Sequence, residues 1–196
     1  MEKNAEKFTS LEARIRQCQI CKSALPYPPN PVFAASRTAK LVIIGQAPGL
    51  LAHKTSTPWN DKSGERLRSW LTMTDALFYD KQQVALIPMG FCFPGYRNKA
   101  DAPPRKECAP AWHAALLAQL SPALTVLVGR YAQQYYQPES HTLTEAVQRC
   151  DFARDPVLVL PHPSGRNNLW LARHTWFSDE VLPALQARIQ RLFPSD

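Results

Sequence analysis

Two short segments of the sequence combine glycine, proline and polar side chains directly after an apolar run. The first is Gly45–Gly49, which follows Leu41–Ile44, and the second is His162–Asn167, which follows Val157–Leu160. The glycines of the first segment allow a tight turn, and Pro48 stiffens that turn and removes one backbone donor. Open α/β sheets bind their ligands beyond the carboxyl ends of the strands. We therefore expect the first segment to form the floor of an active site.

The cysteines are a second group of residues that could carry chemistry. Cys18 and Cys21 form a CxxC ahead of the first apolar run, and Cys92 and Cys108 bracket a loop after the second one. We expect a cytoplasmic protein, in which cysteines are thiols or metal ligands rather than disulfides. Four thiolates bind an iron–sulfur cluster or zinc, and buried free thiols are the third alternative. Cys150 lies outside this pattern and is predicted to be a packed thiol.

The rest of the chain must position these residues, and it alternates between strand and helix patterns. An apolar, β-branched run such as 41–44 is typical of a strand that is covered on both faces in a parallel sheet. Alternating strands and helices predict a three-layer α/β/α fold with a central four-stranded parallel sheet, in a single domain over residues 1–196. The predicted strands are 41–44, 84–89, 124–128 and 157–160, and the predicted helices are 64–71, 111–120, 130–136, 143–150, 166–176 and 178–192.

The first 40 residues are predicted to form a short helix and a loop that carry the CxxC. Thr9 and Glu12 have the spacing of a capping box, which predicts that a helix begins there and delivers Cys18. Residues 22–40 are rich in proline and polar groups and predict an extended loop. The segments 50–63 and 90–110 are predicted to be loops as well.

The charge of the chain favours a polyanionic partner. The formal net charge is +7, and the simplest partner of such a protein is nucleic acid, although a basic soluble protein without such a partner is the alternative. No apolar run approaches the roughly 20 residues that cross a bilayer. The N-terminus lacks the apolar core of a signal peptide. We expect a cytoplasmic monomer that does not associate with a membrane.

The two segments and the cysteine spacing together resemble the uracil-DNA glycosylase superfamily, closest to its iron–sulfur, family 4-like branch. That superfamily has a GEAPG-like motif after the first strand and an HPS motif after the last, and the branch has a similar arrangement of two cysteine pairs. The resemblance extends from about Cys18 to the C-terminus. It implies hydrolysis of the N-glycosidic bond of a flipped base in DNA. It also implies a [4Fe–4S] cluster that pins the N-terminal segment to the loop 92–108.

The resemblance assigns roles to individual residues. His162 would donate a hydrogen bond to the departing base, and Trp59, after Pro58, would stack on that base as the aromatic ring of the family's RPF segment does. From the sequence alone, His162 could instead cap a strand end and Trp59 could be a core aromatic residue. The substrate-binding residues would be Gly45, Ala47, Pro48, Gly49, Trp59 and Asn60, and the DNA-contacting loop would be Ser164, Gly165, Arg166 and Asn167.

The sequence departs from the family at its acidic and base-recognising positions. Gln46 stands where the iron–sulfur branch has Glu, and Ala47 stands where the classical branch has Asp. An amide positions a water molecule but cannot take its proton, so we expect Gln46 to hold the water. Asp61 or His53 are candidates to supply the missing base.

The position that recognises uracil in the iron–sulfur branch is also different in this sequence. Pro88 stands where the iron–sulfur branch has the Asn that recognises uracil, and Pro has no side-chain donor. Asn60, Asn98 or Gln46 could replace it, and nothing in the sequence selects among them. The prediction is therefore a base-excision glycosylase whose specificity has drifted from uracil.

Two other functions remain open from the sequence. One is a non-catalytic module that binds damaged or single-stranded DNA, which the missing carboxylate favours. The other is a hydrolase of free nucleosides or nucleotides built on the same pocket. A continuous basic patch beside the pocket would favour DNA, whereas scattered charges would favour a small substrate. The residues that would form such a patch are Lys99, Arg105, Lys106, Arg166 and Arg173.

Overall fold

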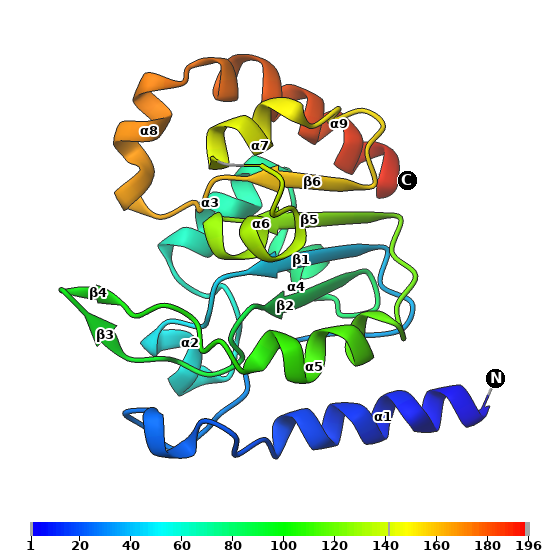
Figure 1. Ribbon diagram of the computed structural model, residues 1–196. Helices are drawn as coiled ribbons and strands as arrows, with labels where there is room; N and C mark the ends of the chain where they lie inside the picture. Colours follow the sequence, from blue (N-terminus) through cyan, green and yellow to red (C-terminus); the bar gives the residue numbers. More distant parts are fainter. Residues whose placement is uncertain (1, 141, 195–196) are drawn as a thin grey trace.

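The computed structural model of the protein describes residues 2–140 and 142–194 (Figure 1). Its centre is a sheet of four parallel strands in the order β2-β1-β5-β6. These strands are β1 (Leu41–Gly45), β2 (Val84–Pro88), β5 (Leu124–Val128) and β6 (Val157–Leu160). The predicted four-stranded parallel sheet is confirmed, and the predicted bounds of β5 and β6 are the observed ones.

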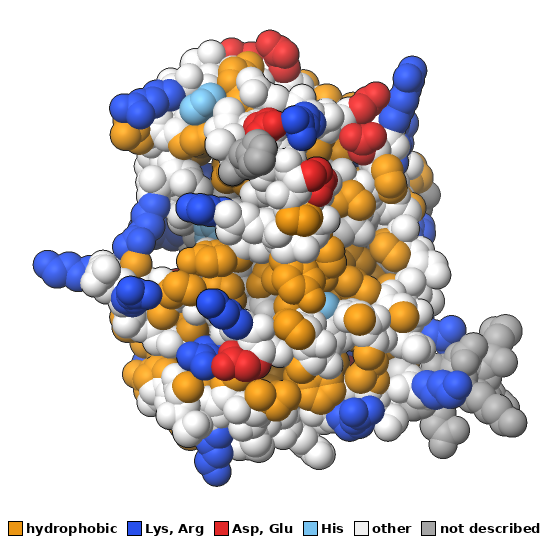
Figure 2. All heavy atoms as spheres, in the orientation of Figure 1, with side chains coloured by type: hydrophobic (Ala, Val, Ile, Leu, Met, Phe, Trp, Pro, Cys, Tyr) orange, Lys and Arg blue, Asp and Glu red, His pale blue; other side chains and the backbone are white. Residues whose placement is uncertain are grey.

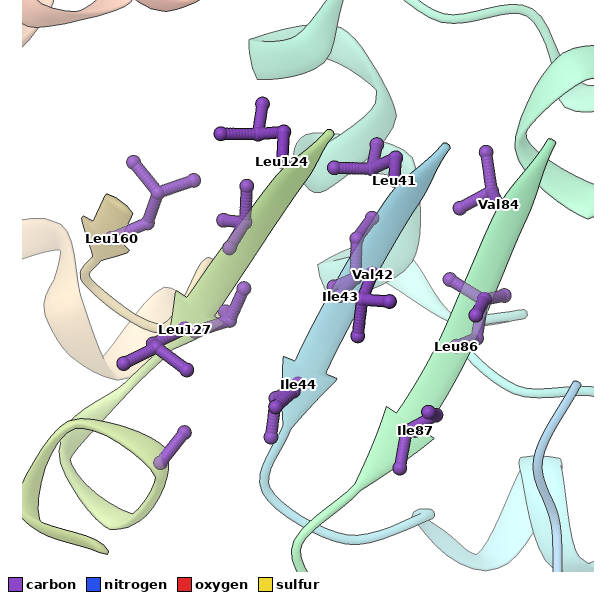
Figure 3. Close-up of a cluster of buried hydrophobic side chains, with 14 of the residues drawn as sticks. Leu41, Val42, Ile43, Ile44, Val84, Leu86, Ile87, Leu124, Leu127 and Leu160 are labelled. Atoms are coloured by element: carbon purple, nitrogen blue, oxygen red, sulfur yellow. The ribbon is translucent and has the colours of Figure 1, made fainter. Parts of the chain in front are cut away.

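The strands form because their apolar side chains are buried on both faces of the sheet. All five residues of β1 are buried, and Ile44 is paired in register with Ile87 of β2 and Leu127 of β5. Figure 3 shows these side chains extending above and below the strands. Burial of this kind is the main favourable contribution to folding, at about 25 cal/mol per Å² of apolar surface. The sheet is therefore a rigid base for the loops at its carboxyl edge.

Helices cover both faces of the sheet, so the predicted three-layer architecture is confirmed. Figure 1 shows α6 and α7 in front of the sheet and α3 and α4 behind it, with α1 lying alongside α5. None of the helices in the described residues has the length and apolar character needed to cross a membrane. The helices are α1 (Glu2–Arg16), α2 (Leu50–Thr55), α3 (Lys62–Leu71), α4 (Asp75–Tyr79), α5 (Cys108–Leu117), α6 (Arg130–Tyr136), α7 (Leu143–Arg149), α8 (Asn168–Arg173) and α9 (Leu182–Leu192), with 3₁₀ turns Lys22–Ala24 and Gly165–Asn167 and a π-helical turn Phe177–Val181.

The N-terminal prediction needs a correction. Helix α1 begins at Glu2, so Thr9 and Glu12 lie inside it and do not form a capping box at its start. Leu11 and Ile15 are buried, and α1 contacts α5. The helix is longer than predicted because this buried apolar stripe gains stability from packing on α5, which the local capping signal does not report.

Several helices differ from the predicted ones. Helix α2 lies within 50–63, and the unpredicted helix α4 follows Thr74, whose side chain caps it. Helix α5 begins at Cys108 rather than at 111, because Pro110 in the first helical turn has no backbone hydrogen bond to lose. The predicted helix 166–176 is divided into a 3₁₀ turn and the shorter α8.

The segment 90–110, predicted as a loop, also contains a β-hairpin. Strands β3 (Tyr96–Arg97) and β4 (Ala100–Asp101) pair antiparallel, and the two residues between them, Asn98 and Lys99, both have positive φ. Positive φ at both central residues is the geometry of a type I′ turn, which suits the twist of a two-residue hairpin. Figure 1 shows the hairpin projecting from the side of the molecule where the sheet strands end.

Candidate active site

The two motif segments meet at the carboxyl edge of the sheet. They line one cavity of about 640 Å³, which we call the large cavity. Its walls include all residues of Gly45–Gly49, the side chains of Trp59 and His162, and Ser164, Arg166 and Asn167 of the second segment. This volume is within the range of about 300–1,000 Å³ that small-molecule sites occupy. The sequence prediction that these segments share a site is consistent with this arrangement.

Gly129 lets the second segment approach the first. Strand β5 lies between β1 and β6, so the loop after β6 must pass over the end of β5. Gly129 ends β5 with φ of +87°, and a Cβ there would lie 3.2 Å from the Cβ of His162. Glycine is favoured at this φ, and any larger residue would push His162 away from the cavity.

His162 is held in place by its own loop and is neutral near pH 7. The Nδ2 atom of Asn167 donates a hydrogen bond of 2.7 Å to the carbonyl oxygen of His162. Burial lowers the pKa of His162 to about 4, and the negative charge of Asp61 opposes this shift only in part. A neutral imidazole carries one N–H, so His162 can donate one hydrogen bond without bringing a positive charge into the cavity.

Trp59 lies between His162 and the first motif. Its ring stacks on the His162 ring, with 5.5 Å between the ring centroids and 29° between the planes. A Cβ on Gly45 would lie 2.6 Å from Cζ2 of Trp59, so only glycine leaves room for the indole. The ring therefore rests directly on the end of β1, which is where a substrate-stacking aromatic group would be needed.

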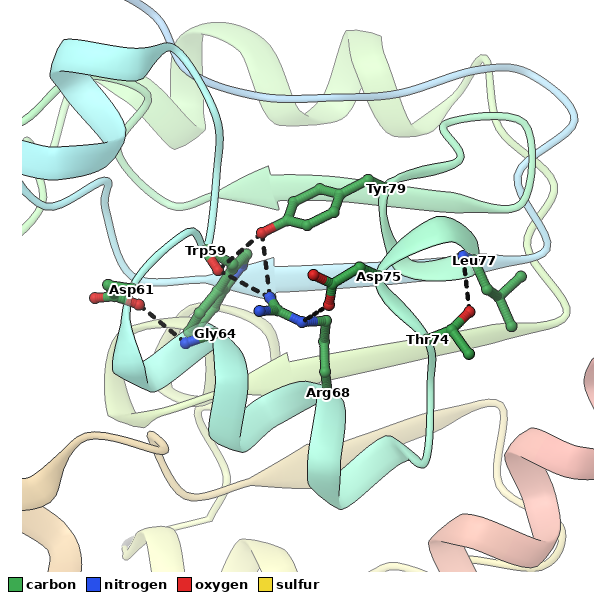
Figure 4. A network of polar contacts seen from close by, with 8 residues as sticks. All are labelled: Trp59, Asp61, Gly64, Arg68, Thr74, Asp75, Leu77 and Tyr79. Atoms are coloured by element: carbon green, nitrogen blue, oxygen red, sulfur yellow. Dashed lines mark hydrogen bonds and ion pairs between the residues drawn. The ribbon is translucent and has the colours of Figure 1, made fainter.

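The backbone of Trp59 is held in an unusual conformation by a polar cluster, drawn in Figure 4. Trp59 has φ of +57°, which is uncommon for a bulky residue. Its carbonyl oxygen accepts hydrogen bonds from Nη1 of Arg68, at 3.1 Å, and from the hydroxyl of Tyr79, at 3.0 Å. Asp75 in turn forms an ion pair of 2.6 Å with Nε of Arg68. These contacts stabilise a conformation that Trp59 would not otherwise favour.

The first turn of α3 completes this support. A Cβ on Gly64 would lie 1.6 Å from the carbonyl oxygen of Trp59, so the helix can pack against Trp59 only because position 64 has no side chain. Gly64, Arg68 and Tyr79 were not predicted from the sequence. No local signal marks them, because their common partner is a backbone carbonyl.

Asp61 caps helix α3 and also lines the large cavity. Its Oδ1 atom accepts a hydrogen bond of 2.9 Å from the backbone N–H of Gly64 and so caps α3. The carboxyl group also lines the cavity, and its charge acts on His162. The prediction that Asp61 takes part in catalysis stays a prediction.

Of three other predicted residues, Gln46, Asn60 and His53, one lines the large cavity and two do not. Gln46 lines the large cavity. Its backbone carbonyl oxygen accepts a hydrogen bond of 3.0 Å from the backbone N–H of Gly90. Asn60 is not among the lining residues, and its amide donates a hydrogen bond of 2.6 Å to Thr55. His53 also lies outside the lining, with its ring 5.4 Å from that of Tyr27.

Two further predicted residues lie outside the lining. Gly165 is absent from the cavity wall, and Asn98 is at the turn of the β3–β4 hairpin. By contrast Pro88, whose position raised doubt about uracil recognition, does line the cavity. The Pro88 carbonyl oxygen lies 3.0 Å from Nε2 of His113.

The hairpin adds two lining residues that were not predicted from the sequence, Tyr96 and Asp101. Of the basic residues proposed for a DNA-binding patch, Arg166 donates a hydrogen bond of 3.2 Å to the carbonyl oxygen of Lys99 at the hairpin tip. Arg105 lies elsewhere, in an ion pair with Glu107. Figure 2 shows several Lys and Arg side chains on the side from which the hairpin projects.

The four predicted metal ligands line a second, small cavity of about 10 Å³, which we call the cysteine cavity. Its walls are Cys18, Cys21, Cys92 and Cys108 with apolar residues that include Phe91 and Trp112. The CxxC and the second cysteine pair are therefore neighbours in space. Cys150 lies elsewhere, and its thiol donates a hydrogen bond to the Ala146 carbonyl oxygen at 3.3 Å.

Burial raises the pKa of three thiols of the cysteine cavity, those of Cys21, Cys92 and Cys108. All five cysteines of the protein are free thiols. Burial raises the pKa of Cys92 to about 11 and that of Cys108 to about 12. Across residues 2–140 and 142–194, no three His, Cys, Asp or Glu side chains are already arranged to hold a metal ion. The four sulfurs nevertheless line one cavity, and thiolate sulfur is the donor type that iron–sulfur clusters and zinc take.

One comparison with known proteins bears on the identity of the chain. The family model described as the uracil DNA glycosylase superfamily matches residues 32–186. The matched region contains both motif segments and the cysteine pair after β2, whereas the CxxC precedes it. The match covers most of the chain, and the three-layer fold agrees with it. This protein therefore belongs to the uracil-DNA glycosylase superfamily.

Proposed function

We propose that the protein is a DNA glycosylase that hydrolyses the N-glycosidic bond of a flipped, damaged base. Membership of the superfamily supports glycosylase activity in general. The observation that carries the proposal for this chain is the pairing of a neutral His162 with Trp59 in the large cavity, directly above the Gly45–Gly49 turn.

The proposed reaction depends on charge that develops as the glycosidic bond stretches. The base gains negative charge, and the sugar becomes cation-like. A preorganised donor aimed at the base typically contributes about 10²–10³ in rate, and the N–H of His162 is suited to that role. Because the imidazole is neutral, it stabilises the base as a hydrogen-bond donor without placing a positive charge near the cation-like sugar. Stacking on Trp59 would add about 1–3 kcal/mol of binding.

DNA is the substrate that the surroundings of the large cavity favour. Arg166 and Lys99 lie together beside the cavity, and the chain has a net charge of +7. A basic patch near the cavity would bind phosphates on either side of a flipped nucleotide. Arg105 does not line the large cavity, and its guanidinium is paired with Glu107.

The base is proposed to differ from uracil in the way it is recognised. Pro88 lines the cavity and offers no side-chain donor. Asn60 donates its amide to Thr55, which leaves Gln46 as the lining amide among the three candidates named above. Hypoxanthine and xanthine are the first alternatives to test, because each is a damaged base with carbonyl groups that a donor can reach.

We also propose that the four thiols of the cysteine cavity hold a [4Fe–4S] cluster, with zinc as the lesser alternative. Support comes from the shared cavity, which the four thiols line together. A metal centre would have to displace the protons of Cys92 and Cys108, whose pKa values burial raises, because the ligands must be thiolates. Such a centre would join the segment before β1 to the loop after β2. No step of the proposed reaction uses it.

The test is cleavage of labelled oligonucleotides that contain one uracil, hypoxanthine or xanthine. We expect abasic sites on at least one of them, and a loss of about 10²–10³ in rate for His162→Ala. His174→Ala is the matched control, because His174 also stacks on a tryptophan, Trp170, with 4.4 Å between ring centroids, but lies outside the large cavity. It should retain full activity.

Two outcomes would contradict the proposal. Tight, salt-sensitive binding without cleavage of any oligonucleotide would instead support the alternative function, a non-catalytic module that binds DNA. Cleavage of free nucleosides in preference to oligonucleotides would favour the small-molecule hydrolase.

A further inference from the structure

The large cavity contains an acidic group that the first motif does not supply. The motif has Gln46 and Ala47 at its two variable positions, and neither side chain accepts a proton from water. Two carboxylates line the cavity, those of Asp61 and Asp101. Asp61 belongs to the loop before α3, whereas Asp101 belongs to strand β4 of the hairpin.

The hairpin brings Asp101 to the first motif. Its Oδ2 atom lies 3.7 Å from the position that a Cβ on Gly49 would occupy, so the carboxyl group rests against the turn that the motif forms. Asp101 is paired in register with Tyr96, and the N–H of Ala102 donates a hydrogen bond of 2.8 Å to the carbonyl oxygen of Gly95, which closes the base of the hairpin. The position of the carboxylate is therefore set by regular structure.

The hairpin also forms a hydrogen bond with the second motif. Arg166 donates its hydrogen bond to the Lys99 carbonyl oxygen at the hairpin tip. The two motif segments and the hairpin thus surround the cavity on three sides, and Asp101 is the hairpin's acidic side chain within it. DNA that engages Arg166 would contact the hairpin at the same time.

Asp61 is less suited to bind the attacking water than Asp101. One of its oxygens already accepts the hydrogen bond from Gly64 that caps α3, so that oxygen is engaged in holding the helix. Within the described part of the chain, no hydrogen bond or ion pair engages the carboxylate of Asp101. Asp101 is exposed to solvent at the cavity wall. Partial desolvation raises its pKa, the charge of Asp61 raises it further, and Arg166 opposes the shift.

We infer that Asp101 is a catalytic residue, which holds and deprotonates the attacking water in place of the carboxylate that the Gly45–Gly49 segment lacks. This inference rests on the proposed function. As the glycosidic C–N bond breaks, its electron pair leaves with the base. The water oxygen forms a bond to the sugar carbon and gives one proton to Asp101, and that proton passes through solvent to the departed base. The products are an abasic sugar and the neutral base.

The first test compares Asp101→Asn with Asp61→Asn in single-turnover cleavage. Removing the general base should lower the cleavage rate by about 10²–10⁴ and leave DNA affinity unchanged. The wild-type rate should fall on the acid side with the titration of Asp101, and this acid limb should be absent from Asp101→Asn. Asp61→Asn should keep the limb. A limb that disappears in Asp61→Asn and persists in Asp101→Asn would overturn the assignment.

The second test does not depend on turnover. Wild type and Asp101→Asn are titrated with two oligonucleotides, one carrying a neutral tetrahydrofuran abasic site and one carrying a cationic pyrrolidine sugar that resembles the transition state. Loss of the carboxylate should weaken binding of the cationic oligonucleotide alone, by about tenfold or more. Equal affinity losses for both oligonucleotides, or none, would overturn the role of Asp101 even if the wild type cleaves DNA. If the wild type cleaves nothing but discriminates between the two sugars through Asp101, the proposed function fails and the carboxylate still faces the sugar.

Discussion

The large cavity and the cysteine cavity are kept in shape in different ways. The large cavity, of about 640 Å³, is shaped by the chain itself: glycines at 45, 64 and 129 allow close approaches, and hydrogen bonds hold the Trp59 carbonyl and the His162 loop. The cysteine cavity, of about 10 Å³, has apolar walls and four thiols. Its polar contacts are few, such as that of the Cys21 thiol with Glu107 at 3.8 Å.

The large cavity is thus preorganised, whereas the cysteine cavity would be completed only by the proposed metal centre. Preorganised donors cost no rearrangement when the substrate reacts, which is how most of the catalytic effect of a polar site arises. Buried thiols with raised pKa values stay protonated until a metal centre displaces their protons, so metal binding in the cysteine cavity would release protons. Substitutions that disturb the cysteine cavity and the large cavity in turn test this contrast.

The largest effect is expected in the cysteine cavity. If a metal centre binds there, Cys108→Ser should abolish it and remove a contribution to stability on the order of 10 kcal/mol, as structural metal sites provide. The measurements are iron and zinc content, the visible absorption of an iron–sulfur cluster, and protease resistance of α1 and the segment 17–40.

The matched control for this prediction is Cys150→Ser. Cys150 is a half-buried thiol, whereas Cys108 is buried, and Cys150 lies away from the cysteine cavity. The variant should keep its metal and its protease resistance. If Cys108→Ser and Cys150→Ser are equally stable and both wild type and variants contain no metal, the contrast between the two cavities is lost and the four cysteines are ordinary packed thiols.

The next largest effect is expected from Gly64→Ala. The added Cβ would meet the backbone carbonyl of Trp59 at 1.6 Å, and a backbone carbonyl held by Arg68 and Tyr79 cannot move aside cheaply. We expect a loss of about 3–5 kcal/mol in the free energy of unfolding, measured by urea denaturation, together with displacement of the Trp59 ring.

Gly165→Ala provides the comparison. A Cβ at Gly165 would meet only the Asn168 side chain, at 3.9 Å, and should change stability by no more than about 0.5 kcal/mol. Similar stabilities for the two alanine variants would show that the large cavity is more deformable than its contacts imply.

The parts of the fold that the sequence predicted well have local causes. The observed bounds of β5 and β6 match the predicted ones because a buried, β-branched run can form little else in a chain of this type. The meeting of the two motif segments followed from the rule that parallel strands end at one edge. The resemblance to the iron–sulfur branch grouped the four cysteines, and these line one cavity.

The parts that the sequence did not predict depend on contacts between distant segments. The β3–β4 hairpin escaped prediction because its turn is Asn98-Lys99, without the glycine that usually marks a type I′ turn. Asp101 was missed with it. Arg68 and Tyr79 were missed because a backbone carbonyl, that of Trp59, brings them together, and a carbonyl has no residue type to recognise.

The smallest of the expected effects concerns His113, which connects the two regions. His113 lies on α5, the helix that begins at Cys108, and its Nε2 atom is 3.0 Å from the carbonyl oxygen of Pro88, a residue of the large cavity. Its Nδ1 atom lies 2.6 Å from the hydroxyl of Tyr136. With Nε2–H donating to the carbonyl, Nδ1 is left to accept from Tyr136, so the imidazole is neutral.

This neutral state makes stability depend on pH. Burial lowers the pKa of His113 from its ordinary value of 6.5 to about 4. Above the unfolded pKa both states are neutral and the contribution is complete. As pH falls from about 6.5 towards 4, the unfolded chain gains a proton that the folded protein refuses, so roughly 3 kcal/mol of stability is lost. Urea unfolding at about pH 7.5 and pH 4.5 should show a smaller loss in His113→Gln, whose amide can still donate to Pro88. The same loss in both proteins would mean that His113 is protonated in the folded state, and that α5 does not link the cysteines to the large cavity through a neutral imidazole.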